Sequence, residues 1–113
     1  MLVRATPLLL AFAIASLSTA TASAADELAL ATHGKALLTQ QCARCHAIER
    51  EGASPLAAAP PFRDIHRKYP VEQLAEAFAE GIVTGHPAMP EFIFTPEEID
   101  AILAHLGTLS DTQ

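Results

Sequence analysis

The chain has 113 residues, with seven Lys and Arg against thirteen Asp and Glu and a formal net charge of −6 at pH 7. This acidic balance argues against nucleic acid as a partner and against binding to an anionic membrane surface, because both need basic side chains. The length allows one small domain, and many domains of this size depend on a disulfide, a metal or another aid to stability.

The first segment, residues 1–24, has the pattern of a secretory signal peptide. Arg4 supplies a positive start, an apolar run extends to Leu17, and Ala22 and Ala24 fit a cleavage site. The apolar run is shorter than the roughly 20 residues that span a bilayer. The alternative is an uncleaved anchor or a buried helix. We therefore expect an exported, periplasmic chain that is not an integral membrane protein after cleavage, with residues 25–113 as its folded domain.

Three helical patterns follow in chain order. The first covers about residues 28–42, where apolar residues recur at helical spacing. The second begins at Pro70, a favourable first helical residue, and ends near Gly81. The third begins at Thr95, whose side chain predicts an N-cap and, with Glu98, a capping box.

The segments between these helices are expected to be irregular. Residues 49–69 are rich in Ala and Pro, and residues 85–94 contain two further prolines. No strand-like alternation of any length is present. The sequence therefore predicts an all-α fold of three or more helices, with long loops that need something to pack against.

The strongest chemical signal is the motif Cys42-Ala43-Arg44-Cys45-His46. Two thiols separated by two residues can form thioether bonds to the two vinyl groups of one porphyrin, and the histidine that follows can ligate the iron. This motif predicts a covalent haem c. The chain has no second motif of this kind, so one haem is the limit.

Other uses of the two cysteines explain less of the motif. A structural disulfide is possible in an oxidising compartment, but it leaves His46 without a role. A thioredoxin-type pair needs a strand followed by a helix, which the pattern does not predict. Zinc and iron–sulfur sites usually need four ligands, and the chain has only two cysteines.

Met89 is the candidate for the second axial ligand, because a thioether is a soft ligand and prolines on both sides stiffen its loop. The alternative is an ordinary core methionine that fills a gap. The only other methionine, Met1, is expected to leave with the signal peptide. His86 is the second candidate, since it could give a bis-histidine haem. The remaining histidines are expected to be surface or packing residues; they are His33, His66 and His105.

The chain resembles the small class I cytochromes c of bacteria, over nearly the whole of the expected mature domain. The resemblance is strongest at the Cys-x-x-Cys-His motif, and it extends to Gly34 with the leucines that follow it and to the terminal helix. Two proline-containing segments also match, Ala-Pro-Pro-Phe at residues 59–62 and Pro-Ala-Met-Pro at residues 87–90. It implies that Gly34 lets the terminal helices cross closely. It also implies that the carbonyl of Pro60 accepts a hydrogen bond from the second ring nitrogen of His46, which would raise the basicity of the ligand.

The chain departs from this family at several positions. Leu38 and His105 stand where the family often has aromatic residues, so we expect the terminal helices to pack differently. The chain has no tryptophan, which leaves three candidates for partners of the haem propionates. These candidates are Tyr69, Arg63 and Arg67. Each of the three could equally be a solvated surface residue.

Ligation by histidine and methionine closes both axial positions and raises the reduction potential relative to an all-nitrogen site. This ligand set, like the resemblance, implies an electron carrier with a redox protein as donor and another as acceptor, and not an enzyme. Within that chemistry, the chain is either a monomer or a fixed subunit of an exported dehydrogenase complex. The rival from another class is an enzyme or gas sensor with an open haem.

Overall fold

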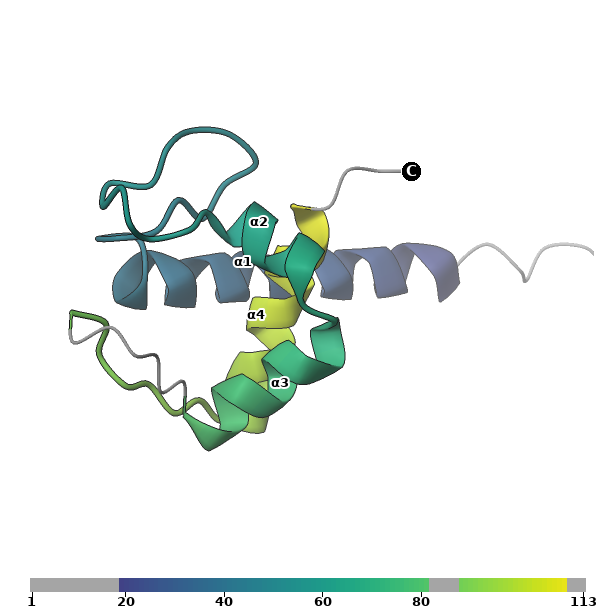
Figure 1. Cartoon of the computed structure of the whole chain (residues 1–113). Coiled ribbons are helices and arrows are strands. Elements are labelled where there is room, and N and C mark those ends of the chain that lie inside the picture. The colour runs from purple at the N-terminus through teal and green to yellow at the C-terminus, as the bar shows by residue number, and fades with distance from the viewer. Residues whose placement is uncertain (1–18, 82–87, 110–113) are drawn as a thin grey trace, which may run out of the picture.

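The computed structural model describes residues 19–81 and 88–109, and in these residues the secondary structure is helical, without strands. The helices are α1 (Thr19–Gln41), α2 (Phe62–Lys68), α3 (Val71–Glu80) and α4 (Pro96–Thr108) (Figure 1). The predicted all-α fold is therefore confirmed.

The first and last helices cross each other at Gly34 (Figure 1). A methyl group on Gly34 would overlap the backbone carbonyl of Ala101 and would lie 2.9 Å from the backbone nitrogen of Ile102. Only glycine permits so close an approach of two helix backbones. Leu38 and Ile102 are fully buried. The predicted close crossing of the terminal helices at Gly34 is confirmed.

Helix α1 begins earlier than the sequence pattern indicates, at Thr19 instead of about residue 28. Residues 19–29 are rich in alanine, the best helix former, and contain neither proline nor glycine to stop the helix. The expected cleavage site after Ala24 falls inside α1. The signal peptide stays a prediction, because residues 1–18 lie outside the described part of the chain.

The prediction of an irregular segment over residues 49–69 is wrong for residues 62–68, which form α2. This helix follows Pro61, whose fixed φ suits a helix start. Phe62 and Ile65, one turn apart, pack against the core, and the helix ends where the Tyr69 amide donates to the Ile65 carbonyl at 3.0 Å. Two apolar residues in a seven-residue helix give too short a pattern for periodicity to detect.

The other two helices lie where the sequence places them. Helix α3 follows Pro70 and ends at Gly81, whose φ of 91° favours glycine. Helix α4 has the predicted capping box: the Thr95 hydroxyl accepts from the Glu98 amide at 3.3 Å, and the Glu98 carboxylate accepts from the Thr95 amide at 2.9 Å. Residues 88–95 are irregular, as expected.

An aromatic cluster fixes the chain between α3 and α4. Phe78 and Phe94 meet edge to face, with ring centroids 5.7 Å apart, and Phe92 stacks on Phe94 at 6.1 Å. The Phe94 amide also donates to the Phe78 carbonyl at 3.3 Å. The loop that contains Met89 is therefore anchored to α3 at its C-terminal end. None of the helices in the described ranges is long and apolar enough to cross a membrane.

Candidate functional site

The cysteine motif follows directly after the end of α1 and forms a hydrogen-bonded turn. The Cys42 amide donates to the Leu38 carbonyl at 2.8 Å, and the Cys42 carbonyl accepts from the amides of Cys45 and His46 at 3.1 and 2.9 Å. Residues at spacings of three and four in a helical turn share one face. This spacing therefore favours placement of the two thiols and the imidazole on one side of the backbone.

Both cysteines are free thiols in the structure. Burial, with a smaller contribution from neighbouring Cys45, raises the pKa of Cys42 to about 11. Cys42 is therefore a neutral thiol near pH 7, unlike the activated thiolate of a thioredoxin-type pair. Within the described residues, no group of three or more His, Cys, Asp or Glu side chains is placed to hold a metal ion.

His46 is buried, with 8% of its surface exposed, and its Nδ1 lies 2.7 Å from the carbonyl oxygen of Pro60. Because a carbonyl oxygen can only accept, Nδ1 must carry the proton. In the neutral ring, Nε2 then keeps its lone pair for a metal ion. The hydrogen bond from His46 to Pro60 is thus present in the structure, and it selects the tautomer that an axial ligand needs.

The ring of His46 has a second contact, which the sequence does not reveal. Phe62 stacks on it with ring centroids 5.0 Å apart and an interplanar angle of 17°. The Phe62 amide donates to the Ala47 carbonyl at 2.9 Å, which ties the start of α2 to the residue after His46. The orientation of the imidazole is therefore fixed both by Pro60 and by Phe62.

The loop after the motif folds back onto it. The Ala47 amide donates to the Ser54 hydroxyl at 3.0 Å, and the Leu56 amide donates to the Cys45 carbonyl at 3.1 Å. These bonds satisfy backbone groups that the loop would otherwise leave unpaired. They also hold Pro60 at the position where its carbonyl meets His46.

Met89 lies half-buried in the loop between α3 and α4. In Figure 1 the segment 42–61 runs above the C-terminal end of α1, and the segment 88–95 runs below it. Met89 is not part of the hydrogen-bonded cluster around His46, so its role as a ligand stays a prediction. The other candidate, His86, lies outside the described residues.

The candidate propionate partners are located on or next to α2. Arg63 donates to the Glu49 carbonyl at 3.4 Å, and Arg67 lies 3.7 Å from Asp64. Tyr69 is half exposed. Both arginines thus have partners within the protein, and a role of the three residues toward propionates stays a prediction.

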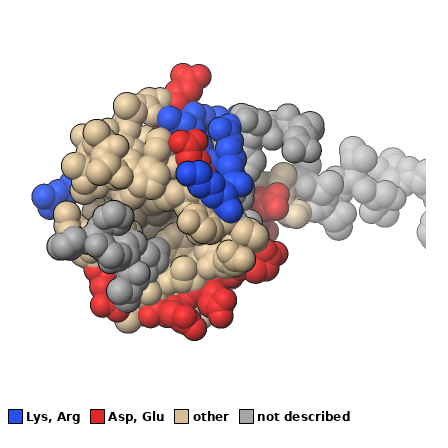
Figure 2. Space-filling model, viewed as in Figure 1, with Lys and Arg blue, Asp and Glu red and all other residues tan. Residues whose placement is uncertain are grey.

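The residues of this face fit a covalent haem c. They supply two free thiols at the right spacing and a buried imidazole with its Nε2 available. Figure 2 shows the middle of the viewed face as hollowed, and the residues visible around the hollow are mostly uncharged. Such surroundings suit a large, mainly apolar ring.

The comparison with protein families agrees with this geometry. The family model described as Cytochrome c matches residues 31–110, which is well over half of the 113-residue chain. Searches of curated proteins and of solved structures gave no significant match. The matched range contains the cysteine motif, the Pro60 segment, Met89 and the whole of α4. From the extent of this match and the all-helical structure of the described residues, we conclude that the chain belongs to the cytochrome c family.

Proposed function

We propose that this chain is an exported electron carrier with a single haem c, bound through Cys42 and Cys45 and ligated by His46 and Met89. Its donor and acceptor are redox proteins of the periplasm. The family supports haem-based electron transfer, and the pattern of residues 1–24 supports export. The acidic net charge fits protein partners better than nucleic acid.

The observation that carries the proposal is the 2.7 Å hydrogen bond from His46 Nδ1 to the Pro60 carbonyl, in a histidine that directly follows the second of two free cysteines. A histidine that ligates iron usually donates its other ring N–H to a carbonyl or carboxylate, which orients the ring and raises its basicity. His46 has such a partner, and Phe62 restricts its rotation further. A buried histidine in a disulfide-bonded surface turn would not require this arrangement.

The protein's own residues have three tasks in this function. Cys42 and Cys45 would hold the cofactor covalently, and His46 and Met89 would ligate its iron. A haem iron bound there supplies one-electron chemistry between its ferric and ferrous states. The buried surroundings of His46 limit the access of water and so keep the ligand set unchanged while the charge changes.

The test is to express the full chain in a bacterium that has a cytochrome c maturation system and to isolate the protein from its periplasm. We expect one haem per chain, and we expect this haem to remain on the protein after extraction with acid and acetone. A redox titration should show a single one-electron transition. A haem-free protein recovered under these conditions would contradict the proposal.

Variants of the two cysteines separate covalent attachment from mere binding. Cys42→Ala and Cys45→Ala should each leave at most one thioether bond, and the double variant should lose its haem on extraction. Arg44→Ala changes the same motif without removing a thiol and should keep the wild-type haem content. Haem that stayed bound through extraction in the double variant would rule out attachment through these cysteines.

A further inference from the structure

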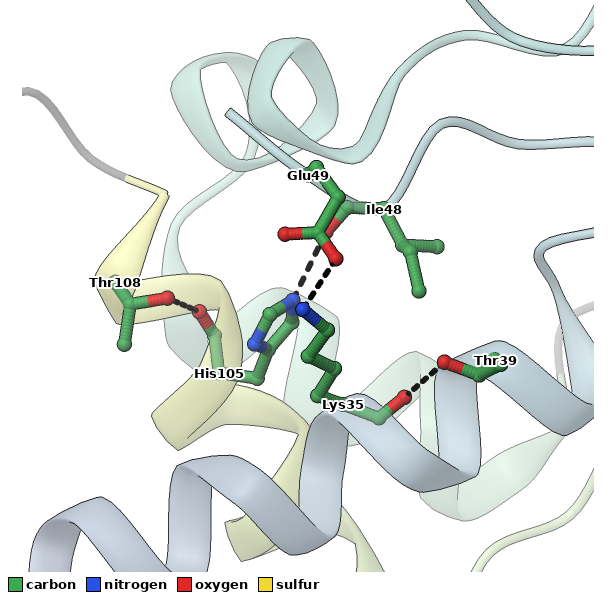
Figure 3. Close-up of polar contacts among 6 residues, drawn as sticks. All are labelled: Lys35, Thr39, Ile48, Glu49, His105 and Thr108. Atoms are coloured by element: carbon green, nitrogen blue, oxygen red, sulfur yellow. Dashed lines mark hydrogen bonds and ion pairs between the residues drawn. The ribbon is translucent and has the colours of Figure 1, made fainter. Parts of the chain in front are cut away.

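His105 has a contact that the proposed function does not use. It is buried in α4, with 5% of its surface exposed, and its Nε2 donates a hydrogen bond to the Ile48 carbonyl at 2.9 Å (Figure 3). Ile48 is the second residue after His46. The hydrogen bond therefore joins the terminal helix directly to the chain that leaves the axial histidine.

The next residue, Glu49, is held by two other helices. Its carboxylate pairs with Lys35 of α1 at 2.6 Å (Figure 3), and its carbonyl accepts from Arg63 of α2 at 3.4 Å. The ion pair is half exposed, with 50% and 51% of the two side chains accessible, and such pairs contribute little to stability. The contact with Arg63 is long for a hydrogen bond. Of the three contacts, only that of His105 is both buried and short.

The surroundings of Ile48 make its hydrogen bond costly to lose. Ile48 is itself buried in the core. A buried carbonyl without a donor carries its full desolvation cost, so it regains a partner only if the chain moves or water enters. Ala47 stands between Ile48 and His46, and both its amide and its carbonyl are bonded to other segments. Phe62, which donates to the Ala47 carbonyl, also stacks on the His46 ring, so a shift at Ile48 that moved Ala47 would disturb both the backbone next to His46 and the ring packed against it.

We propose that His105 is a positioning residue for the axial ligand: its ring fixes the chain after His46 and so keeps the imidazole in one orientation in both oxidation states. This inference rests on the proposed function, in which His46 ligates the haem iron. The orientation of a ligand and the entry of water are both factors by which a protein sets a reduction potential. Water that entered near the iron would stabilise the more highly charged ferric state, so loss of the His105 contact lowers the potential.

The test compares three variants of the haem-loaded protein by redox titration. His105→Leu replaces the hydrogen-bond donor with an apolar side chain. It should shift the equilibrium between ferrous and ferric protein toward the ferric state threefold to tenfold, where tenfold corresponds to about 59 mV. His105→Gln keeps an N–H donor of similar reach and should restore most of the wild-type potential. Ile102→Val removes one methyl group from the fully buried Ile102 on the same helix and should lower the melting temperature at unchanged potential.

A purely structural role would lower the melting temperature of His105→Leu and leave its potential at the wild-type value, and this result would overturn the proposal. An equal shift in His105→Gln and His105→Leu would overturn it too, because the donor would then be irrelevant. A wild-type protein without haem would instead contradict the proposed function.

If His105→Leu does not fold, nitrogen NMR of the wild-type ring keeps the proposal testable. His105 Nε2 should carry a proton that exchanges slowly with water in both the ferric and the ferrous protein. Rapid exchange of that proton, or its absence, in either state would overturn the inference.

Discussion

At the scale of single residues, the proposed ligation by Met89 would close a haem iron bound at this site to outside ligands. Met89→Ala should open one axial position and lower the reduction potential, because water, hydroxide or imidazole stabilises ferric iron better than a thioether does. Haem attachment should survive, since Cys42, Cys45 and His46 are unchanged. Absorption spectra and a redox titration would measure both effects. An unchanged spectrum and potential would exclude Met89 as the ligand.

His86 is three residues from Met89 and is the natural substitute ligand in that variant. If its imidazole replaces the thioether, Met89→Ala should remain low-spin. The double variant Met89→Ala with His86→Ala should then be high-spin and should bind carbon monoxide quickly in the reduced state. His86→Ala alone serves as the control and should keep the wild-type spectrum, because in the proposed ligand set Met89 would still close the iron.

The sequence identifies candidate residues where their spacing along the chain carries the chemistry. The order of Cys42, Cys45 and His46 is local, so the motif indicates haem attachment without knowledge of the fold. The contacts of Phe62 with His46 and of His105 with Ile48 join residues that are 16 and 57 positions apart. Such contacts depend on how the helices pack, and no local pattern reports them.

At the scale of helices, the crossing of α1 and α4 depends on Gly34. Gly34→Ala should destabilise the protein by about 2 kcal/mol. Overlap of the added methyl group with the Ala101 backbone costs about 3 kcal/mol, and the higher helix propensity of alanine offsets about 1 kcal/mol of that cost. Chemical denaturation of the haem-loaded protein would measure this loss.

Gly107 provides the matched control for that substitution. It lies in α4, and a methyl group there would meet nothing within 4 Å. Gly107→Ala should therefore leave the free energy of unfolding unchanged or raise it by up to about 1 kcal/mol. If Gly34→Ala and Gly107→Ala had the same effect, the close crossing would not be what requires glycine at position 34.

Helix starts and stops are predictable from sequence where side chains mark them. Thr95 and Glu98 bond the first turn of α4, and Gly81 ends α3 with a positive φ. Helix α2 has no side-chain cap, and its proline neighbours indicate a loop as readily as a helix start. The first described residues of α1 are rich in alanine, which favours a helix without marking where it begins.

At the scale of the whole molecule, charge is unevenly distributed over the surface. Acidic side chains gather along the lower edge of the view in Figure 2, where α3 and the beginning of α4 lie. The exposed acidic residues of these two helices form what we call the acidic edge; they are Glu72, Glu76, Glu80, Glu97 and Asp100. Some of these negative charges also lie near helix N-termini, where they interact favourably with the helix dipole. Their presence alone therefore does not define a docking surface.

The acidic edge makes a prediction about the partner. If it guides docking, the partner presents basic side chains, and electron transfer between the two should slow as ionic strength rises, because salt screens charges beyond about 8 Å at 0.15 M. The triple variant Glu72→Gln, Glu76→Gln, Glu80→Gln should reduce both the rate at low salt and its dependence on salt. Stopped-flow kinetics with the purified partner would measure both quantities.

A control with the same change in net charge separates local docking from overall attraction. Asp26, Glu27 and Glu51 are exposed and lie outside α3 and α4. Their triple amide variant removes three negative charges without altering the acidic edge, so it should keep most of the salt dependence. Equal losses in the two triple variants would mean that net charge alone steers the encounter. A rate that stayed flat or rose with ionic strength in the wild type would exclude electrostatic docking through this edge.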